Sequence, residues 1–220
     1  MTDEVSVVIP CRDEAGALPG VIGAVPGGYA VVVVDNGSTD GTADVARSLG
    51  ARVVVESVPG YGSAVHAGVL AAETPIVCTI DGDGSMDPAD LVPMVAAVRD
   101  GADLAVGRRR ALTSRVWPWH ARLGSVIVAT GLRIKYRDTI HDIGPMRVAR
   151  TAALLELGVT DRRSGYPVEL LVRAMNAGWR IREFDVAYRP RAAGRSKVSG
   201  SLRGSFIAAT DFLTALRHVT

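Results

Sequence analysis

Short apolar runs, many of them β-branched, alternate with helix-like segments through the first hundred residues, and this alternation limits the fold more than any other feature. The apolar runs predict four buried strands, at residues 5–10, 30–35, 52–56 and 75–80. The segments between and after them predict helices at 15–24, 42–49, 62–72 and 87–98. Strands that alternate with helices form βαβ units with a parallel sheet and right-handed crossovers. We therefore expect an α/β fold, a mostly parallel sheet with flanking helices.

The second half of the chain is less regular. Its pattern predicts a strand at 104–107, helices at 119–134, 147–157 and 168–177, and a strand at 180–188. Residues 189–204 are rich in Gly, Ser and Arg, which is typical of a loop, and residues 205–217 have the apolar stripe of a final helix. No internal repeat or linker interrupts the 220 residues, so we expect a single domain over 1–220.

Composition excludes several classes of protein. A hydrophobic fraction of 48% and a charged fraction of 22% are those of an ordinary globular protein, not of a disordered chain or a disulfide scaffold. The two cysteines, Cys11 and Cys78, lie within apolar runs, as core cysteines do. The acidic start does not resemble a secretory signal, and no apolar run approaches the roughly 20 residues that span a bilayer. These features predict a cytoplasmic protein that could still work at a membrane surface.

Charge is divided unevenly along the chain. The first 100 residues hold 14 acidic and 4 basic side chains, whereas residues 101–220 hold 9 acidic and 21 basic ones. An acidic half suits cations, or a nucleotide held through one, and a basic half suits phosphates, anionic lipid or nucleic acid. Aromatic residues make up only 5% of the chain, which argues against the stacking surfaces of a nucleic-acid binder.

The most specific polar segment is TIDGDGSMDP, residues 79–88. Asp81 and Asp83 follow a predicted buried strand, where ligands of such sheets bind. Paired carboxylates can hold Mg²⁺ or Mn²⁺ and leave coordination sites for diphosphate oxygens. An Asp-Gly turn with solvated acids, in which Asp87 caps the next helix, is the other interpretation. Asp35, at the end of another strand, could accept a hydrogen bond from a base or a ribose.

The order of several segments carries a family resemblance. Residues 7–14 (VVIPCRDE), 35–42 (DNGSTDGT) and 81–83 (DGD) resemble the family 2 glycosyltransferases with a GT-A fold, and within them the dolichyl-phosphate mannose synthase-like group. Residues 60–64 (GYGSA) resemble the glycine-rich loop of that family, 141–147 (HDIGPMR) its acceptor-side motif and 191–197 (RAAGRSK) its late basic loop. The resemblance covers nearly the whole chain.

This resemblance implies a Rossmann-like GT-A domain that transfers a hexose, with inversion and a divalent metal, from a nucleotide-diphospho-sugar. It divides the chain into a donor and metal half, 1–100, and an acceptor half, 101–220. Donor-binding residues are expected at Pro10, Arg12, Glu14, Asp35, Gly62, Asp81, Gly82 and Asp83, with Mg²⁺ or Mn²⁺ on Asp81 and Asp83. Diphosphate or acceptor contacts are expected at Arg191, Arg195, Ser196 and Lys197, and catalytic roles at Asp142, Arg147 and Lys197. Asn36 and Ser85 depart from the pattern, which has an acid at the first position and often a Gln at the second.

The expected acceptor is a polyprenyl phosphate at the inner face of the cell membrane. Asp142 is the candidate general base for a hydroxyl acceptor, whereas a phosphate is already anionic and would need Asp142 only to position a group. The rings, aliphatic side chains and arginines of residues 117–134 favour peripheral membrane contact or an amphipathic helix on the sheet.

Three alternatives stay open: the same transfer to a soluble phosphorylated or hydroxyl acceptor, nucleotidyl transfer onto a sugar phosphate, and a non-catalytic nucleotide-binding module. The sequence also leaves a homo-oligomer open.

Overall fold

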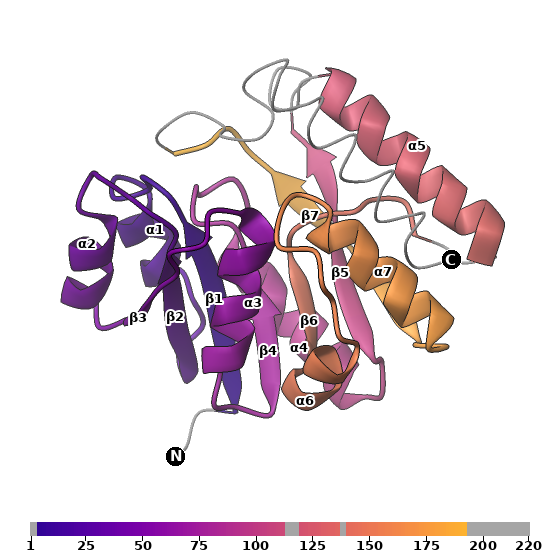
Figure 1. Ribbon diagram of the computed structural model, residues 1–220, viewed down its shortest axis with the longest axis horizontal. Coiled ribbons are helices and arrows are strands. Elements are labelled where there is room, and N and C mark those ends of the chain that lie inside the picture. The colour runs from indigo at the N-terminus through magenta and orange to yellow at the C-terminus, as the bar shows by residue number, and fades with distance from the viewer. Residues whose placement is uncertain (1–3, 113–118, 137–139, 193–220) are drawn as a thin grey trace.

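A seven-stranded sheet forms the centre of the molecule, with the strand order β3-β2-β1-β4-β6-β5-β7 (Figure 1). The computed structural model describes residues 4–112, 119–136 and 140–192. The strands are β1 (Val5–Cys11), β2 (Tyr29–Asp35), β3 (Arg52–Val55), β4 (Ile76–Thr79), β5 (Leu104–Ala111), β6 (Arg147–Arg150) and β7 (Ile181–Tyr188). All neighbouring pairs are parallel except those of β6, which runs antiparallel to both β4 and β5. The predicted mostly parallel α/β sheet is confirmed.

Helices cover both faces of this sheet, which makes a single three-layered domain. They are α1 (Leu18–Gly23), α2 (Thr42–Ser48), α3 (Tyr61–Ala71), the 3₁₀ turn η1 (Pro88–Asp90), α4 (Leu91–Arg99), α5 (Trp119–Tyr136), α6 (Thr151–Glu156) and α7 (Tyr166–Asn176). One apolar core joins α3, α6 and α7 to the face turned toward the viewer in Figure 1, and the other joins α1, α2 and α4 to the opposite face. Each strand of the sheet centre is therefore buried on both sides, as its continuous apolar run predicts.

Two of the predicted elements are wrong in part. Residues 147–157 were expected to form one helix, but residues 147–150 form β6, and only Thr151–Glu156 is helical. The cause is tertiary: β6 fills the gap between β4 and β5 and satisfies the backbone groups of both. The strand at 52–56 was expected to be buried on both faces, yet β3 is the edge strand and the side chain of Val55 is 65% exposed.

The strand register brings the predicted polar segments to one edge of the sheet. Cys11 at the end of β1 lies beside Asp35 at the end of β2, and Val8 of β1 lies beside Thr79 at the end of β4. The loops that follow these three strands therefore begin side by side at their carboxyl ends, where α/β sheets bind ligands. Among the described residues, no helix is long and apolar enough to cross a membrane.

Candidate active site

The loops after β1 and β2 are joined by hydrogen bonds between side chains of one and backbone amides of the other. The amide of Asp13 donates to Ser38 Oγ at 2.9 Å, and that of Glu14 donates to Thr42 Oγ1 at 2.9 Å. In return, the amide of Thr39 donates to Asp13 Oδ1 at 2.8 Å. Asp13 has a φ of 54°, an unusual backbone conformation for a residue other than glycine, and these bonds hold it there. These hydrogen bonds join the two loops into one rim at the carboxyl ends of β1 and β2.

Asn36 ties the β2 loop to the approach to α3. Its Nδ2 donates to the carbonyl oxygens of Glu56 and Val58, both at 2.8 Å, and its Oδ1 accepts the amide of Gly60 at 2.8 Å. An aspartate at this position could not donate to the two carbonyls. The amide at the departing position of the family pattern therefore has a structural reason, because it holds the chain that leads to Gly60. The neighbouring Asp35 is 8% exposed and accepts the amide of Ser38 at 3.0 Å through Oδ1.

The turn after β4 holds the two predicted metal ligands. Asp83 is only 2% exposed, and its Oδ1 accepts the amide of Ser85 at 2.8 Å. A side chain at Gly82 would clash, because its Cβ would lie 2.6 Å from Cys11 Sγ. Burial and the Asp83 carboxylate raise the pKa of Asp81 to about 7, against the lowering effect of Arg191, Arg109 and Arg147. A raised pKa in one of two neighbouring carboxylates is a pattern found at functional sites, including those that bind a cation.

The donor set fits a hard divalent cation held partly by a ligand. Within the described ranges, no group of three or more His, Cys, Asp and Glu side chains is placed to hold a metal. A site of two carboxylates is what Mg²⁺ or Mn²⁺ uses when phosphate oxygens and waters complete its coordination. Asp81 and Asp83 are the residues that would hold the ion.

The segment after β7 lies against this turn. Its amides at Arg189 and Ala192 donate to the carbonyl oxygens of Ser85 at 2.8 Å and Asp83 at 2.9 Å. Arg191 pairs through Nη2 with Asp83 Oδ2 at 3.0 Å and through Nη1 with Glu14 Oε1 at 3.4 Å. Arg191, which was expected at the diphosphate, therefore pairs with the carboxylates of Asp83 and Glu14.

Asp142 lies in a second buried cluster, on the β5 side of the sheet edge. Its carboxylate accepts Arg109 Nε and Nη2, both at 2.8 Å, the Arg109 amide at 2.9 Å and Ser125 Oγ at 2.6 Å. Burial raises the pKa of Asp142, but Arg109 and Ser125 together hold it below its ordinary value. Glu183 of β7 accepts the amides of His141 and Asp142 at 2.7 and 3.0 Å and so fixes the loop that carries this carboxylate.

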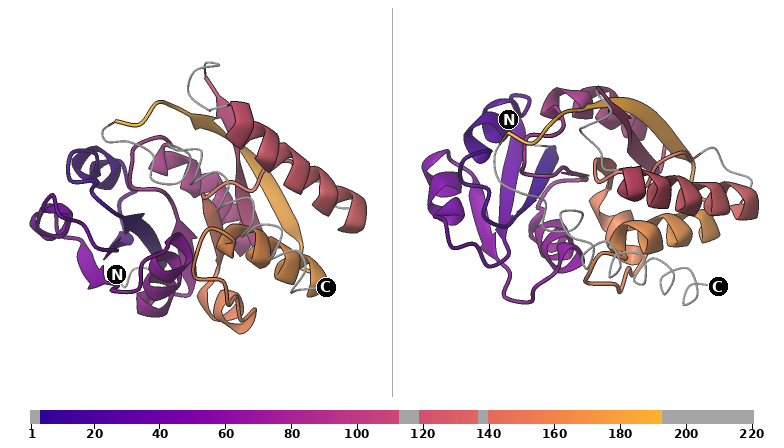
Figure 2. Two further views of the ribbon diagram at one scale, coloured as in Figure 1. Left: turned by 45° about the horizontal axis from the view of Figure 1, so that its top comes forward. Right: turned by 90° about the horizontal axis from the view of Figure 1, so that it is seen from above.

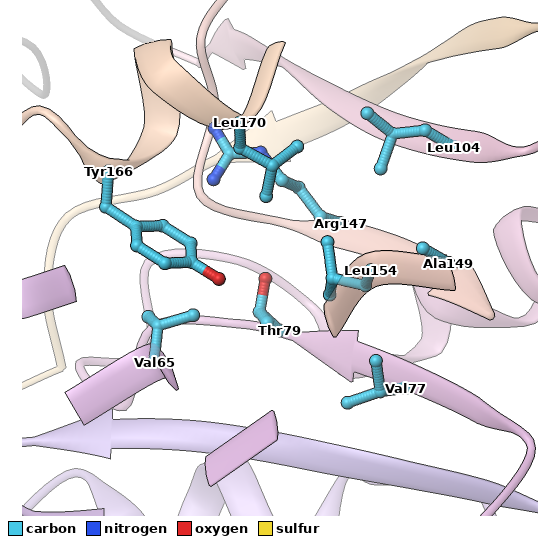
Figure 3. Close-up of a pocket in the computed structure, with 9 residues that line it drawn as sticks. All are labelled: Val65, Val77, Thr79, Leu104, Arg147, Ala149, Leu154, Tyr166 and Leu170. Carbon is cyan, nitrogen blue, oxygen red and sulfur yellow. The ribbon is translucent and has the colours of Figure 1, made fainter. Parts of the chain in front are cut away.

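Arg147 is buried beneath the turn after β4 that carries the two predicted metal ligands (residues 81–86, the metal-site turn), since it pairs with Thr79 in the β4–β6 register. It lines a small cavity with Thr79, Tyr166, Leu170 and other apolar side chains, and Figure 3 shows the Tyr166 hydroxyl directed toward Thr79. Its Nη2 donates to the carbonyl of Ile143 at 3.1 Å, while its buried Nε has no hydrogen-bond partner among the described residues. Burial lowers the pKa of Arg147. A buried side-chain donor without a partner is uncommon in folded proteins.

Comparison with known proteins identifies the family. Residues 6–158 match the model of the family described as glycosyl transferase family 2. The chain belongs to glycosyltransferase family 2. Within this family, a Mycobacterium tuberculosis glycosyltransferase described as uncharacterized is 62% identical over 210 residues, which are 96% of each chain. The dolichyl-phosphate hexose transferase of Haloferax volcanii is 33% identical over 93% of this chain and 91% of its own. The polyprenol monophosphomannose synthase of Mycolicibacterium smegmatis is 34% identical over 91% of this chain and 83% of its own.

Solved structures confirm the GT-A fold. Glucosyl-3-phosphoglycerate synthase from M. tuberculosis superposes with a TM-score of 0.78 at 22% identity, covering 98% of this chain and 79% of the synthase. Structures of that synthase contain Mn²⁺ or Mg²⁺ with UDP. The resemblance of the sequence to family 2 glycosyltransferases, and to the dolichyl-phosphate mannose synthase-like group, is therefore confirmed.

The site of this family 2 glycosyltransferase brings together most of the residues expected from its sequence. Pro10, Arg12 and Glu14 lie at the end of β1, and Asp35 ends β2. The metal-site turn contains Asp81, Gly82 and Asp83, and Arg191 pairs with Asp83 and Glu14 beside it. Gly62 has a packing reason, because a Cβ there would lie 2.6 Å from the carbonyl oxygen of Asp161. Arg195, Ser196 and Lys197, with the predicted helix 205–217, lie outside the described residues.

The structure adds Arg109 to this site. The sequence shows only a run of three arginines after a predicted strand, and nothing in the run singles out the second. Arg109 differs because alternation along β5 turns its side chain to Asp142, whereas Arg110 pairs with the exposed Asp185 at 2.8 Å.

Proposed function

We propose that this glycosyltransferase moves a hexose from a nucleotide-diphospho-sugar to a polyprenyl phosphate, with Mg²⁺ or Mn²⁺ and with inversion. The observation that carries the proposal is the meeting of opposite charges at one sheet edge. The acidic pair Asp81 and Asp83 suits a metal-bound diphosphate, and Arg109, Arg147 and Arg191 are close enough to Asp81 to lower its pKa. A negatively charged acceptor and a negatively charged leaving group both need such cations. Two relatives, one named dolichyl-phosphate hexose transferase and the other polyprenol monophosphomannose synthase, support the lipid acceptor.

The transfer is a direct displacement at the anomeric carbon. An acceptor phosphate oxygen forms the new bond as the bond to the nucleoside diphosphate breaks, and the electron pair of that bond leaves with the diphosphate. A divalent ion on Asp81 and Asp83 would supply neutralisation of the departing charge. The rim formed by the β1 and β2 loops holds Asp35 where it can accept a hydrogen bond from the base or the ribose.

Asp142 suits a positioning role better than that of a general base. Both of its oxygens already accept hydrogen bonds, and its pKa is lowered, so it has little tendency to take a proton at neutral pH. A phosphate acceptor is already anionic and needs no strong base, which agrees with this chemistry. Asp142 instead holds the Arg109 guanidinium in one orientation near the metal site.

The outer face of α5 supports a membrane-bound acceptor over a soluble one. Five of the ten large exposed apolar side chains among the described residues lie on α5 or just before it: Leu112, Leu123, Val126, Ile127 and Ile134. The helix contains no Asp or Glu but carries Arg122, Arg133 and Lys135. Figures 1 and 2 show α5 alongside β5 and β7, at the end of the sheet opposite β3. An apolar stripe with basic flanks fits an anionic membrane surface.

The same helix links that surface to the site, because Ser125 on its buried face donates to Asp142. An acceptor phosphate held at the membrane along α5 would therefore be near Arg109, which Asp142 holds in place.

Transfer assays with several nucleotide sugars and Mn²⁺ test the proposed function. We expect labelled sugar on polyprenyl phosphate in anionic vesicles and little on 3-phosphoglycerate or simple alcohols. Asp83→Asn should abolish transfer. Asp87→Asn should not, because Asp87 belongs to the same turn but caps η1 by accepting the amide of Ala89. Transfer to the soluble acceptors alone would contradict the lipid acceptor, and release of a nucleoside triphosphate from the sugar nucleotide and pyrophosphate would support nucleotidyl transfer instead.

Membrane contact is tested separately by sedimentation with vesicles that contain anionic lipid. Binding should weaken as salt rises, because ions screen the basic side chains. Ile127→Ser should reduce it, whereas Leu70→Ser, which removes an equally exposed apolar side chain from α3, should leave it unchanged. Equal effects of the two variants would mean that α5 is not the contact surface.

A further inference from the structure

Arg191 occupies the carboxylate that the proposed metal needs. Its Nη2 lies 3.0 Å from Asp83 Oδ2, and its Nη1 lies 3.4 Å from Glu14 Oε1. The other oxygen of Asp83 already accepts the amide of Ser85. Both oxygens of this buried carboxylate are thus engaged within the protein, one of them by a unit positive charge.

The backbone holds Arg191 in this position. Residues 189–192, which we call the strap, cross the metal-site turn, and the amides of Arg189 and Ala192 donate hydrogen bonds to the carbonyl oxygens of Ser85 and Asp83. Gly84 makes the crossing close, since a Cβ there would lie 2.9 Å from the Ala192 methyl carbon, and its φ of 74° also favours glycine. The guanidinium is therefore delivered to Asp83 by a fixed segment and does not reach it by chance from a free surface position.

A guanidinium and a divalent ion cannot share one carboxylate oxygen at contact distance without strong repulsion. We propose that Arg191 is a surrogate cation: it neutralises Asp83 in the metal-free protein, must leave Asp83 when the metal binds, and is then available to the diphosphate that arrives with the metal. The inference rests on the proposed metal site and adds to it an internal competitor. Metal alone must displace Arg191 at a cost, whereas metal with a diphosphate gives the displaced guanidinium a new anionic partner.

The strap offers a matched control. Arg189 lies two residues before Arg191, but its Nη1 pairs with Asp87 at 3.4 Å, outside the proposed metal pair. Arg191→Gln removes the competing charge, and Arg189→Gln removes a charge of the same kind from the same segment. Any general effect of lower positive charge on metal binding should appear in both variants, so the difference between them isolates the contact with Asp83.

The test is a Mn²⁺ titration of the full chain without nucleotide, in which electron paramagnetic resonance measures the free Mn²⁺. Arg191→Gln should bind Mn²⁺ more tightly than the wild type, on the order of 10-fold, as expected for removal of one positive charge near a partly buried site. Arg189→Gln should bind as the wild type does. Equal or weaker Mn²⁺ binding by Arg191→Gln would overturn the surrogate role.

Inorganic pyrophosphate provides the second measurement and separates this inference from the proposed function. Pyrophosphate should tighten Mn²⁺ binding in the wild type by a larger factor than in Arg191→Gln, since only the wild type gains the displaced guanidinium as a partner. The same factor in both proteins would overturn the handover to the diphosphate while the metal site stands. No Mn²⁺ binding by any variant, with or without pyrophosphate, would overturn the metal site and the surrogate together.

Discussion

Replacement of Asp142 by alanine should destabilise the fold far more than removal of a surface carboxylate that also pairs with an arginine. The substitution leaves the Arg109 side chain, which is only 15% exposed, and the Ser125 hydroxyl without the carboxylate that accepts their hydrogen bonds. Breaking a buried pair by removing one partner costs about 3–5 kcal/mol, because the remaining charge stays buried without compensation. For a domain of this size, that loss lowers the melting temperature by about 6–20 °C.

The matched control is Asp185→Ala. Asp185 pairs with Arg110 at 2.8 Å, the same distance as the pair of Asp142 with Arg109, but both side chains of this pair are more than half exposed. Exposed pairs contribute about 0.2–1 kcal/mol, so the control should shift the melting temperature by less than about 4 °C. Thermal and urea unfolding of both variants provide the comparison. If Asp142→Ala has the same melting temperature and urea midpoint as Asp185→Ala, the reasoning from burial is refuted, and water must reach Arg109 once its partner is gone.

Four further predictions follow from individual contacts. Asp142 stabilises the fold through its lowered pKa; this stability is complete above the unfolded pKa of about 3.9 and is lost as pH falls through the folded value. In urea titrations, the difference in unfolding free energy between the wild type and Asp142→Asn should therefore shrink between pH 7 and pH 3. Gly68→Ala should cost about 1–3 kcal/mol in the same assay, because the new Cβ would lie 2.2 Å from a buried valine methyl, whereas Gly131→Ala on the open side of α5 should be neutral or stabilising. Asp83→Ala should abolish Mn²⁺-dependent binding of a nucleoside diphosphate in calorimetry, and unchanged affinity would remove the metal role. Asp35→Ala should weaken nucleotide binding several-fold even without metal, by about 1 kcal/mol, and an effect seen only with metal would mean that Asp35 is placed wrongly.

The sequence predicts the edge of the sheet where β1, β2 and β4 end, because the signal of each strand lies within its own residues. Each of β1, β2 and β4 is a continuous apolar run that ends in polar residues, and parallel strands bring such ends together without further information. The pair Asp81 and Asp83 is visible for the same reason, since both residues follow one strand.

The acceptor side depends on contacts between residues far apart in the chain, and there the sequence is less informative. Residues 147–150 have the spacing of a helix start but become β6, because a gap between β4 and β5 is available to them. Asp142 meets Arg109 across 33 residues, and Arg191 meets Glu14 across 177. Neither pairing leaves a periodic signal, so only the folded chain shows which arginine of a run faces which carboxylate.

The insertion of β6 also orders events during synthesis of the chain. β4 pairs with β1 on one edge, but its other neighbour begins with Arg147, which pairs with Thr79. At a translation rate of about 5–20 residues per second, β4 is synthesised on the order of 10 s before β6, and one of its edges lacks its pairing partner during that time. The unpaired backbone N–H and C=O groups of such an edge can pair with another chain. Between the emergence of β4 and that of β6, the free edge of β4 is therefore open to pairing with other chains.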